Sequence, residues 1–137
     1  MQRAFVRRDA IDIARTVADR VILGTMARLD YATRDWRAGA SNEAEIRRLA
    51  EAFATLADAM TDTLALHTDF SLWESYERLN RVEKVRNPDF TKVLVDNASC
   101  GYCRSYQYEC AEHWYRHEMK DLAVAVKKKV ASGDRVK

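Results

Sequence analysis

The sequence predicts an all-α protein, an antiparallel helical bundle of three long and two short helices. Apolar residues recur at three- and four-residue steps along most of the 137 residues, which is the period of one helical face. Only four glycines and one proline interrupt this pattern, and no run of alternating β-branched residues indicates a strand. No repeat or linker divides the chain, so residues 1–137 are expected to form a single helical domain.

The first long helix is expected from about Arg3 to about Arg37, because Gly39 lies just beyond it, where a helix can end. Its buried face is expected to be the stripe in which apolar side chains follow one another at helical steps. This stripe consists of Val6, Ala10, Ile13, Val17 and Val21, widened by Ala14, Ala18, Ile22 and Leu29.

The second long helix is expected to begin at Asn42 and to run to about His67. Asn42 and Glu45 have the spacing of a capping box, in which each side chain bonds a free backbone amide of the other residue. The predicted buried stripe is the strongest amphipathic signal in the chain and contains Ile46, Leu49, Ala50, Phe53, Leu56, Ala57, Met60 and Leu64.

Three further helices complete the predicted bundle. Ser71 and Glu74 form a second possible capping box, which opens a short helix. The second short helix begins at the segment NPDF, residues 87–90, where proline suits the first helical position. The last long helix is expected from about Tyr102 to about Ala131.

The charge pattern argues against a nucleic-acid or membrane partner. The formal net charge is +2, and acidic and basic residues alternate along the chain rather than forming blocks. No apolar run approaches the roughly 20 residues that a membrane span needs, and the first twenty residues do not resemble a signal peptide. The chain is therefore expected to be soluble, and its compartment stays open.

The segment Cys100-Gly-Tyr-Cys103 is a possible redox dithiol, since a C-x-x-C motif at a helix start can lower a thiol pKa. Thioredoxin-like enzymes place this motif after a strand, and none is predicted here. Helical peroxidases of the alkylhydroperoxidase D type carry a relay histidine four residues after the motif, where this chain has Gln107. A stand-alone helical dithiol protein therefore remains an alternative interpretation.

His113 and His117 lie four residues apart, a spacing that places two zinc ligands on one helical face. Glu109 and Cys110 lie close by in the sequence, but a structural zinc site needs four ligands from a defined motif. The favoured interpretation is that both histidines occupy bundle positions, with their ring nitrogens bonded to neighbouring groups. No metal or other cofactor is expected.

No catalytic motif is present in the sequence. There is no G-x-S-x-G, no glycine-rich phosphate loop and no H-E-x-x-H. The pairs Glu74–Glu77 and Glu109–Glu112 are neighbours on one helix, whereas a glycosidase pair must face across a cleft. The aromatic residues that crowd the third and last helices fit a core or an interface with another domain.

Three blocks of the chain resemble the C-terminal helical domain of α-N-acetylglucosaminidases, glycoside hydrolase family 89. The segment RDAIDIAR has Asp9, Asp12 and Arg15 at the spacing of the family's first-helix pattern. The segment FATLADAMTDTLALHTDFSLWESYERL is similar to the family's second block without a gap, and GYCRSYQYECAEHWYRHEM is similar to the third. The chain departs from the family at Ser75, Gln107 and Met119, where the family usually has tryptophan.

The resemblance implies a non-catalytic accessory domain of a hydrolase. In the family the catalytic glutamates belong to a preceding barrel domain, so the expected partner is such a barrel, in the same or a neighbouring chain. A family loop that approaches the sugar site is shortened here between Ser99 and Gly101. The candidate residues for contact with carbohydrate at its rim are Asn97, Tyr102, Arg104 and Tyr106. A helical protein-interaction module is a further alternative.

Overall fold

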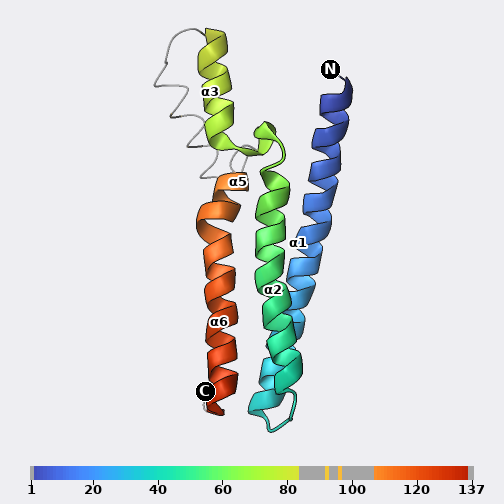
Figure 1. Cartoon of the computed structure of the whole chain (residues 1–137), viewed down its shortest axis with the longest axis vertical. Helices are drawn as coiled ribbons and strands as arrows, with labels where there is room; N and C mark the ends of the chain where they lie inside the picture. The colour runs from blue at the N-terminus through green and yellow to red at the C-terminus, as the bar shows by residue number, and fades with distance from the viewer. Residues whose placement is uncertain (1, 84–91, 93–95, 97–106, 136–137) are drawn as a thin grey trace.

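The computed structural model describes residues 2–83, 92, 96 and 107–135, and these contain helices and no strand. The long helices are α1 (Gln2–Arg37), α2 (Glu43–Leu64) and α6 (Arg116–Ser132). Helices α1 and α6 run in one direction and α2 runs in the other (Figure 1). The predicted all-α class is confirmed. The short helix predicted from residue 87 falls almost entirely outside the described residues, and so do residues 102–106 of the predicted last helix.

Shorter elements join the long helices at one end of the molecule. A 3₁₀ turn, η1 (Thr68–Phe70), leads into α3 (Leu72–Glu83). Helix α5 (Gln107–Cys110) continues through a π-helical turn, η3 (Ala111–Tyr115), directly into α6. The last helix is therefore one rod that contains a wider turn near its start.

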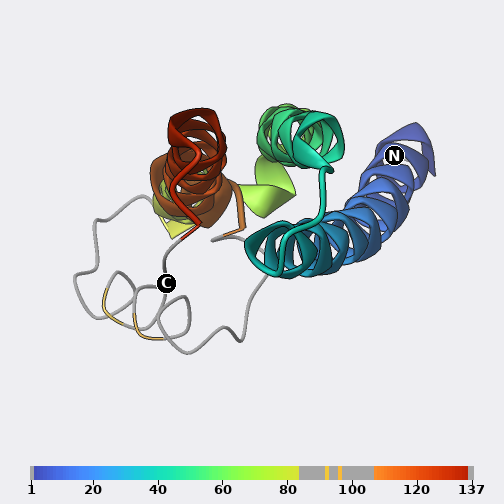
Figure 2. The same cartoon turned by 90° about the horizontal axis from the view of Figure 1, so that it is seen from below.

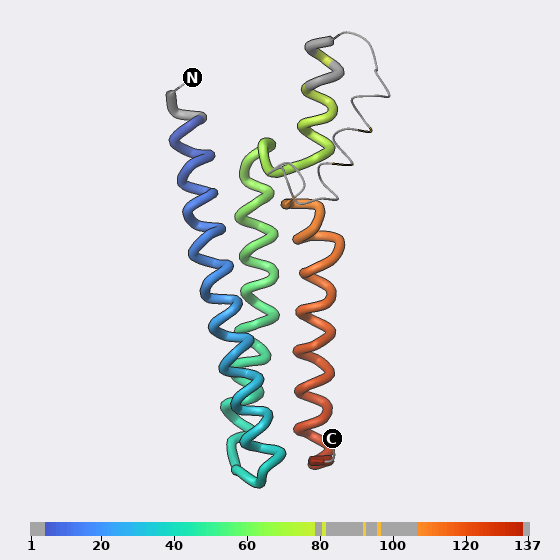
Figure 3. Tube along the Cα trace, turned by 180° about the vertical axis from the view of Figure 1, so that it is seen from behind, coloured from blue at the N-terminus to red at the C-terminus, as the bar shows by residue number. Residues whose placement is uncertain are grey.

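Helix α2 lies between the other two long helices and packs against both (Figures 1 and 3). This central position explains why the apolar stripe predicted for α2 is confirmed: Ile46, Leu49, Ala50, Phe53, Ala57, Met60 and Leu64 are buried, and Leu56 is half-buried. Two core clusters lie along α2. One joins it to Leu29 and Trp36 of α1 and to Val130 of α6, and the other joins it to Ile11 and Phe70.

The buried face predicted for α1 is wrong for its main stripe but right for three of the residues that widen it, Ala18, Ile22 and Leu29. Val6, Ile13, Val17 and Val21 are 67%, 66%, 56% and 46% exposed. The residues that face α2 are Ile11 and Leu29, which are buried, and Ala18 and Ile22, which pack against the core; of these four, the prediction had omitted Ile11. At about 100° per residue, the mean directions of the two stripes differ by about 120° around the helix, so burying one leaves the other exposed. Helix α1 crosses α2 obliquely, and its N-terminal end diverges from α2 (Figure 2).

The turn between α1 and α2 confirms the predicted helix end and corrects the predicted cap. Gly39 has a φ of 114°, a conformation that favours glycine. Asn42 forms no capping bond: its Oδ1, the acceptor that a cap needs, is buried without a described partner, while its Nδ2 donates to the carbonyl of Ala32 at 2.9 Å. Glu45 pairs with arginines rather than with Asn42. The tight turn holds Asn42 against α1, so the capping-box prediction is wrong although the helix begins there.

Trp36 closes this end of the bundle. It is buried, and its indole Nε1–H donates to Glu43 at 3.0 Å. Arg135, just after α6, also donates to Glu43, at 3.2 Å, and its guanidinium carbon lies 5.3 Å from the centroid of the Trp36 ring. These contacts tie α1, α2 and the residues after α6 together.

In the described part of the chain, no helix combines the length and apolarity needed to cross a membrane.

Candidate functional site

Most of the predicted site residues cannot be placed. The carbohydrate-rim candidates and the dithiol, Asn97, Cys100, Tyr102, Cys103, Arg104 and Tyr106, all lie outside the described residues. These predictions stay predictions.

The two predicted bundle histidines point to solvent. His113 lies in the π-helical turn and His117 in the first turn of α6, and both are exposed. The buried residues of this rod are Ala111, Ala123 and Val130, so neither histidine occupies a core position, and the predicted bonds of their ring nitrogens to neighbouring groups stay a prediction. The residues that the structure describes contain no group of three His, Cys, Asp or Glu side chains that could hold a metal ion.

Cys110 is half-buried in the rod just before the π-helical turn. Burial raises the pKa of its thiol, and the nearby Glu109 carboxylate raises that pKa further. A raised pKa leaves little thiolate at neutral pH, so Cys110 is poorly suited to nucleophilic chemistry.

Glu109 links the last helix to α3. Its carboxylate accepts hydrogen bonds from the Ser71 hydroxyl at 2.7 Å, from the Leu72 backbone N–H at 2.9 Å and from the Trp73 backbone N–H at 3.2 Å. The Ser71 Oγ in turn accepts from the Glu74 N–H at 3.2 Å, which is half of the predicted capping box. A carboxylate at a helix N-terminus is favourable, because the free N–H groups and the helix dipole stabilise negative charge. Glu109 therefore caps α3 from a distant part of the chain.

This cap forms one wall of a groove of about 470 Å³ at the junction of α2, η1, α3 and the last helix. We call it the junction groove. Six of the polar and aromatic residues that line it are His67, Thr68, Trp73, Glu74, Tyr108 and His113. The π-helical turn contributes His113, and such turns occur frequently at functional sites.

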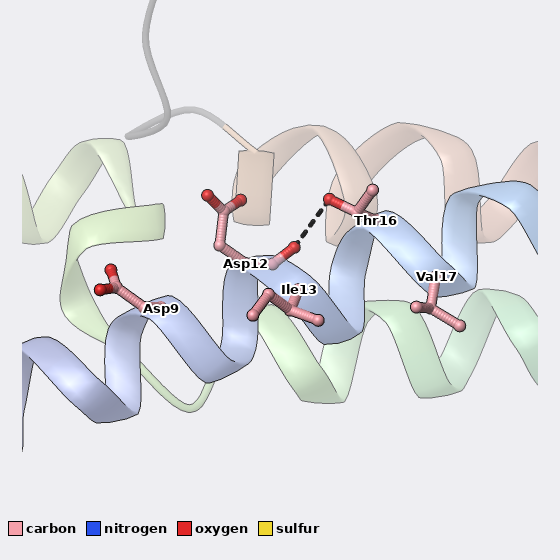
Figure 4. Close-up of a pocket in the computed structure, with 5 residues that line it drawn as sticks. All are labelled: Asp9, Asp12, Ile13, Thr16 and Val17. Carbon is pink, nitrogen blue, oxygen red and sulfur yellow. Dashed lines mark hydrogen bonds between the residues drawn. The ribbon is translucent and has the colours of Figure 1, made fainter.

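A second candidate surface lies on the outside of α1. We call Val6, Ala10, Ile13, Val17 and Val21 the α1 outer face; all five are exposed. Figure 4 shows Ile13 and Val17 beside a hollow of about 290 Å³ that Asp9, Asp12 and Thr16 also line. The Thr16 hydroxyl donates to the Asp12 carbonyl at 2.8 Å, so that part of the hollow is helix backbone. A contiguous exposed apolar stripe of this kind is typical of an interaction surface.

Gly24 continues the α1 outer face by one turn, three residues after Val21. A glycine inside a helix is about 1 kcal/mol less favourable than alanine. Nothing within the described chain requires it, because an added Cβ would meet no described atom within 4 Å. A close approach by another molecule would explain a residue without a side chain at this position.

Sequence reasoning identified the residues of the α1 outer face and some of those in the junction groove, but not their roles. It assigned the α1 outer face to the core, and it treated Glu109 and His113 as possible zinc neighbours. The aromatic residues that crowd the third and last helices were the signal that indicated a core or an interface with another domain. No family model, no curated protein and no solved structure matches the chain.

Proposed function

We propose that this chain is a non-catalytic accessory domain of an α-N-acetylglucosaminidase-like glycoside hydrolase, packing on a separate catalytic barrel and bracing its carbohydrate site. The family resemblance of the sequence suggests the parent enzyme. The observation that carries the proposal is the α1 outer face, because a domain that packs on another must present a contiguous apolar surface.

The extent of this face suits a domain interface. From Val6 to Val21 it spans 15 residue steps, which is about 22 Å of helix at about 1.5 Å per residue. Burying one valine or isoleucine side chain contributes about 1.5–3 kcal/mol. Asp9 and Arg20 lie along one edge of the stripe and give it a polar border there. A long helix that is packed along one side gains stability when its other apolar side is covered.

A binding role is also favoured over catalysis by the state of the groove carboxylates. Glu74 and Glu109 both line the junction groove, but both Glu109 oxygens accept bonds from backbone N–H groups of α3. A carboxylate held in this way is poorly placed to donate or to accept a proton during bond cleavage. The proposal therefore assigns acid–base chemistry to the barrel.

The first test is the reading frame upstream of this chain in its genome. The proposal expects a barrel domain with a pair of catalytic carboxylates, either fused to this chain or encoded next to it. A neighbourhood without such a barrel contradicts the proposal.

The second test measures binding of that barrel by isothermal titration calorimetry. We expect Ile13→Glu and Val17→Glu to weaken binding by at least a hundredfold, since each buries a charge in an apolar interface. Val124→Glu is the matched control, because Val124 is equally apolar and 44% exposed but lies on α6. Equal binding by all three variants would show that the α1 outer face is not the contact.

The dithiol alternative concerns residues that the structure does not describe. It predicts that Cys100→Ser and Cys103→Ser each abolish reduction of peroxides or disulfides by the chain. Activity that is no greater than a protein-free blank ends that alternative.

A further inference from the structure

We infer that the junction groove binds a neutral saccharide, with the Trp73 indole as its stacking surface. This inference deepens the proposed function by naming a surface of this chain that contacts carbohydrate. It rests on the proposed function for the choice of sugar, and its test uses the 137-residue chain alone.

Trp73 supplies an aromatic surface that the fold leaves open. It lies in the first turn of α3, and it is 61% exposed. Its ring centroid is 6.1 Å from that of Tyr76, and its backbone N–H is bonded to Glu109. An exposed amphipathic ring beside a groove can pack on the apolar face of a sugar.

The groove offers both hydrogen-bond donors and acceptors. His67 Nδ1 accepts the Asp69 N–H at 3.1 Å, so the proton of the neutral imidazole lies on Nε2, which is then a donor. The Glu74 carboxylate is an acceptor, and the Tyr108 hydroxyl can do either. A sugar hydroxyl both donates and accepts, so a mixed lining of this kind matches a polyhydroxylated ligand.

Other classes of ligand fit the groove less well. No lysine or arginine is among the described residues that line it, which disfavours phosphate, sulfate and carboxylate ligands. An organic cation would find the Glu74 carboxylate, but the Glu109 charge is already offset by the N-terminus of α3. The groove volume of about 470 Å³ lies within the range of small-molecule sites.

The test is a titration of the ¹⁵N-labelled chain with methyl N-acetyl-α-D-glucosaminide, followed by amide and indole NMR signals. Choline is titrated in parallel as an organic cation. We expect the sugar to shift the Trp73 indole N–H and the amides of Trp73, Glu74 and His113. Trp73→Ala should weaken binding about tenfold or more. Trp114→Ala should bind as the original chain does, because Trp114 is 57% exposed but does not line the groove.

Several results would overturn the inference. These are the absence of sugar-dependent shifts, shifts that lie outside the groove, shifts that persist in Trp73→Ala, and a response to choline alone. Glu74→Gln keeps the groove shape and should weaken sugar binding several-fold, so it tests the groove if Trp73→Ala does not fold. Ile13→Glu should leave the titration unchanged. A failure of barrel binding can thereby be told apart from a failure of sugar binding.

Discussion

Replacing Glu109 with alanine is expected to destabilise α3 while leaving the α1–α2 pair intact. The change removes the acceptor of three hydrogen bonds, of 2.7, 2.9 and 3.2 Å, to the first residues of α3. Loss of an N-terminal cap costs about 0.5–2 kcal/mol, and hydrogen bonds to charged groups contribute about 1.5–3 kcal/mol each when buried. Trp73 is exposed, so water replaces part of what is lost. We therefore expect a loss of about 2 kcal/mol for Glu109→Ala, near the upper end of the cap range.

Hydrogen exchange measured residue by residue is the suitable assay, because it separates local opening from global unfolding. A loss of about 2 kcal/mol corresponds to exchange about 30-fold faster for amides of α3. Glu109→Gln keeps one acceptor oxygen and loses the charge, so it should lie between the original chain and alanine. Glu118→Ala is the control on the same rod, since Glu118 bonds only Trp114 among the described residues. Unchanged protection of α3, or a uniform loss along all helices, would refute this explanation of the cap.

Three further results are expected. Gly24→Ala should stabilise the isolated chain against urea by about 1 kcal/mol, because the new Cβ has open space around it; a less stable variant would contradict this. A hydrogen bond from Lys120 lowers the pKa of Asp58 below its ordinary value of 3.8, so the stability it contributes is present above that pH and is lost as pH falls through the folded pKa. The melting temperature should therefore fall more steeply between pH 5 and pH 3 for the original chain than for Asp58→Asn. Parallel curves of melting temperature against pH would count against the pairing of Asp58 with Lys120. In a chain whose other two cysteines are serine, Cys110 should react with Ellman's reagent more slowly when folded than when unfolded, because burial raises the pKa of its thiol; equal rates would show that burial does not protect it.

The sequence was sufficient to predict α2 and the end of α1. Helix α2 has a single strong apolar stripe, and it packs against both α1 and α6. The residues of that stripe are therefore buried, as their spacing predicts. Gly39 ends α1 for a local reason, its positive φ, which requires no knowledge of the rest of the chain.

Helix α1 could not be oriented from its sequence. It carries one stripe through Ile13 and Val17 and another through Ile11 and Ile22, which point in different directions around the helix. Both stripes have helical spacing, and the stripe through Ile13 and Val17 has the more regular steps. Which stripe faces α2 depends on packing with a distant segment, and periodicity does not contain that information.

The junction groove depends on contacts between residues far apart in the sequence. Ser71 and Glu109 are separated by 38 positions. The sequence indicated a local partner for Ser71, namely Glu74, in a capping box. Of the two bonds of that box, the one from the Glu74 N–H to the Ser71 Oγ is formed. The additional cap required the last helix to begin beside η1. The π-helical turn that exposes His113 has no sequence signal of its own, because it differs from an α-helix by one extra residue in a turn.

The central position of α2 also bears on the order in which the helices assemble. A turn of five residues, 38–42, joins α1 and α2, so their contacts close a short loop. Contacts between α2 and α6 close a far longer one, and such contacts form more slowly. The α1–α2 hairpin is therefore the natural folding nucleus, and docking of the last helix is the later step. Because synthesis proceeds from the N-terminus, this hairpin can form on the ribosome before α6 has been made.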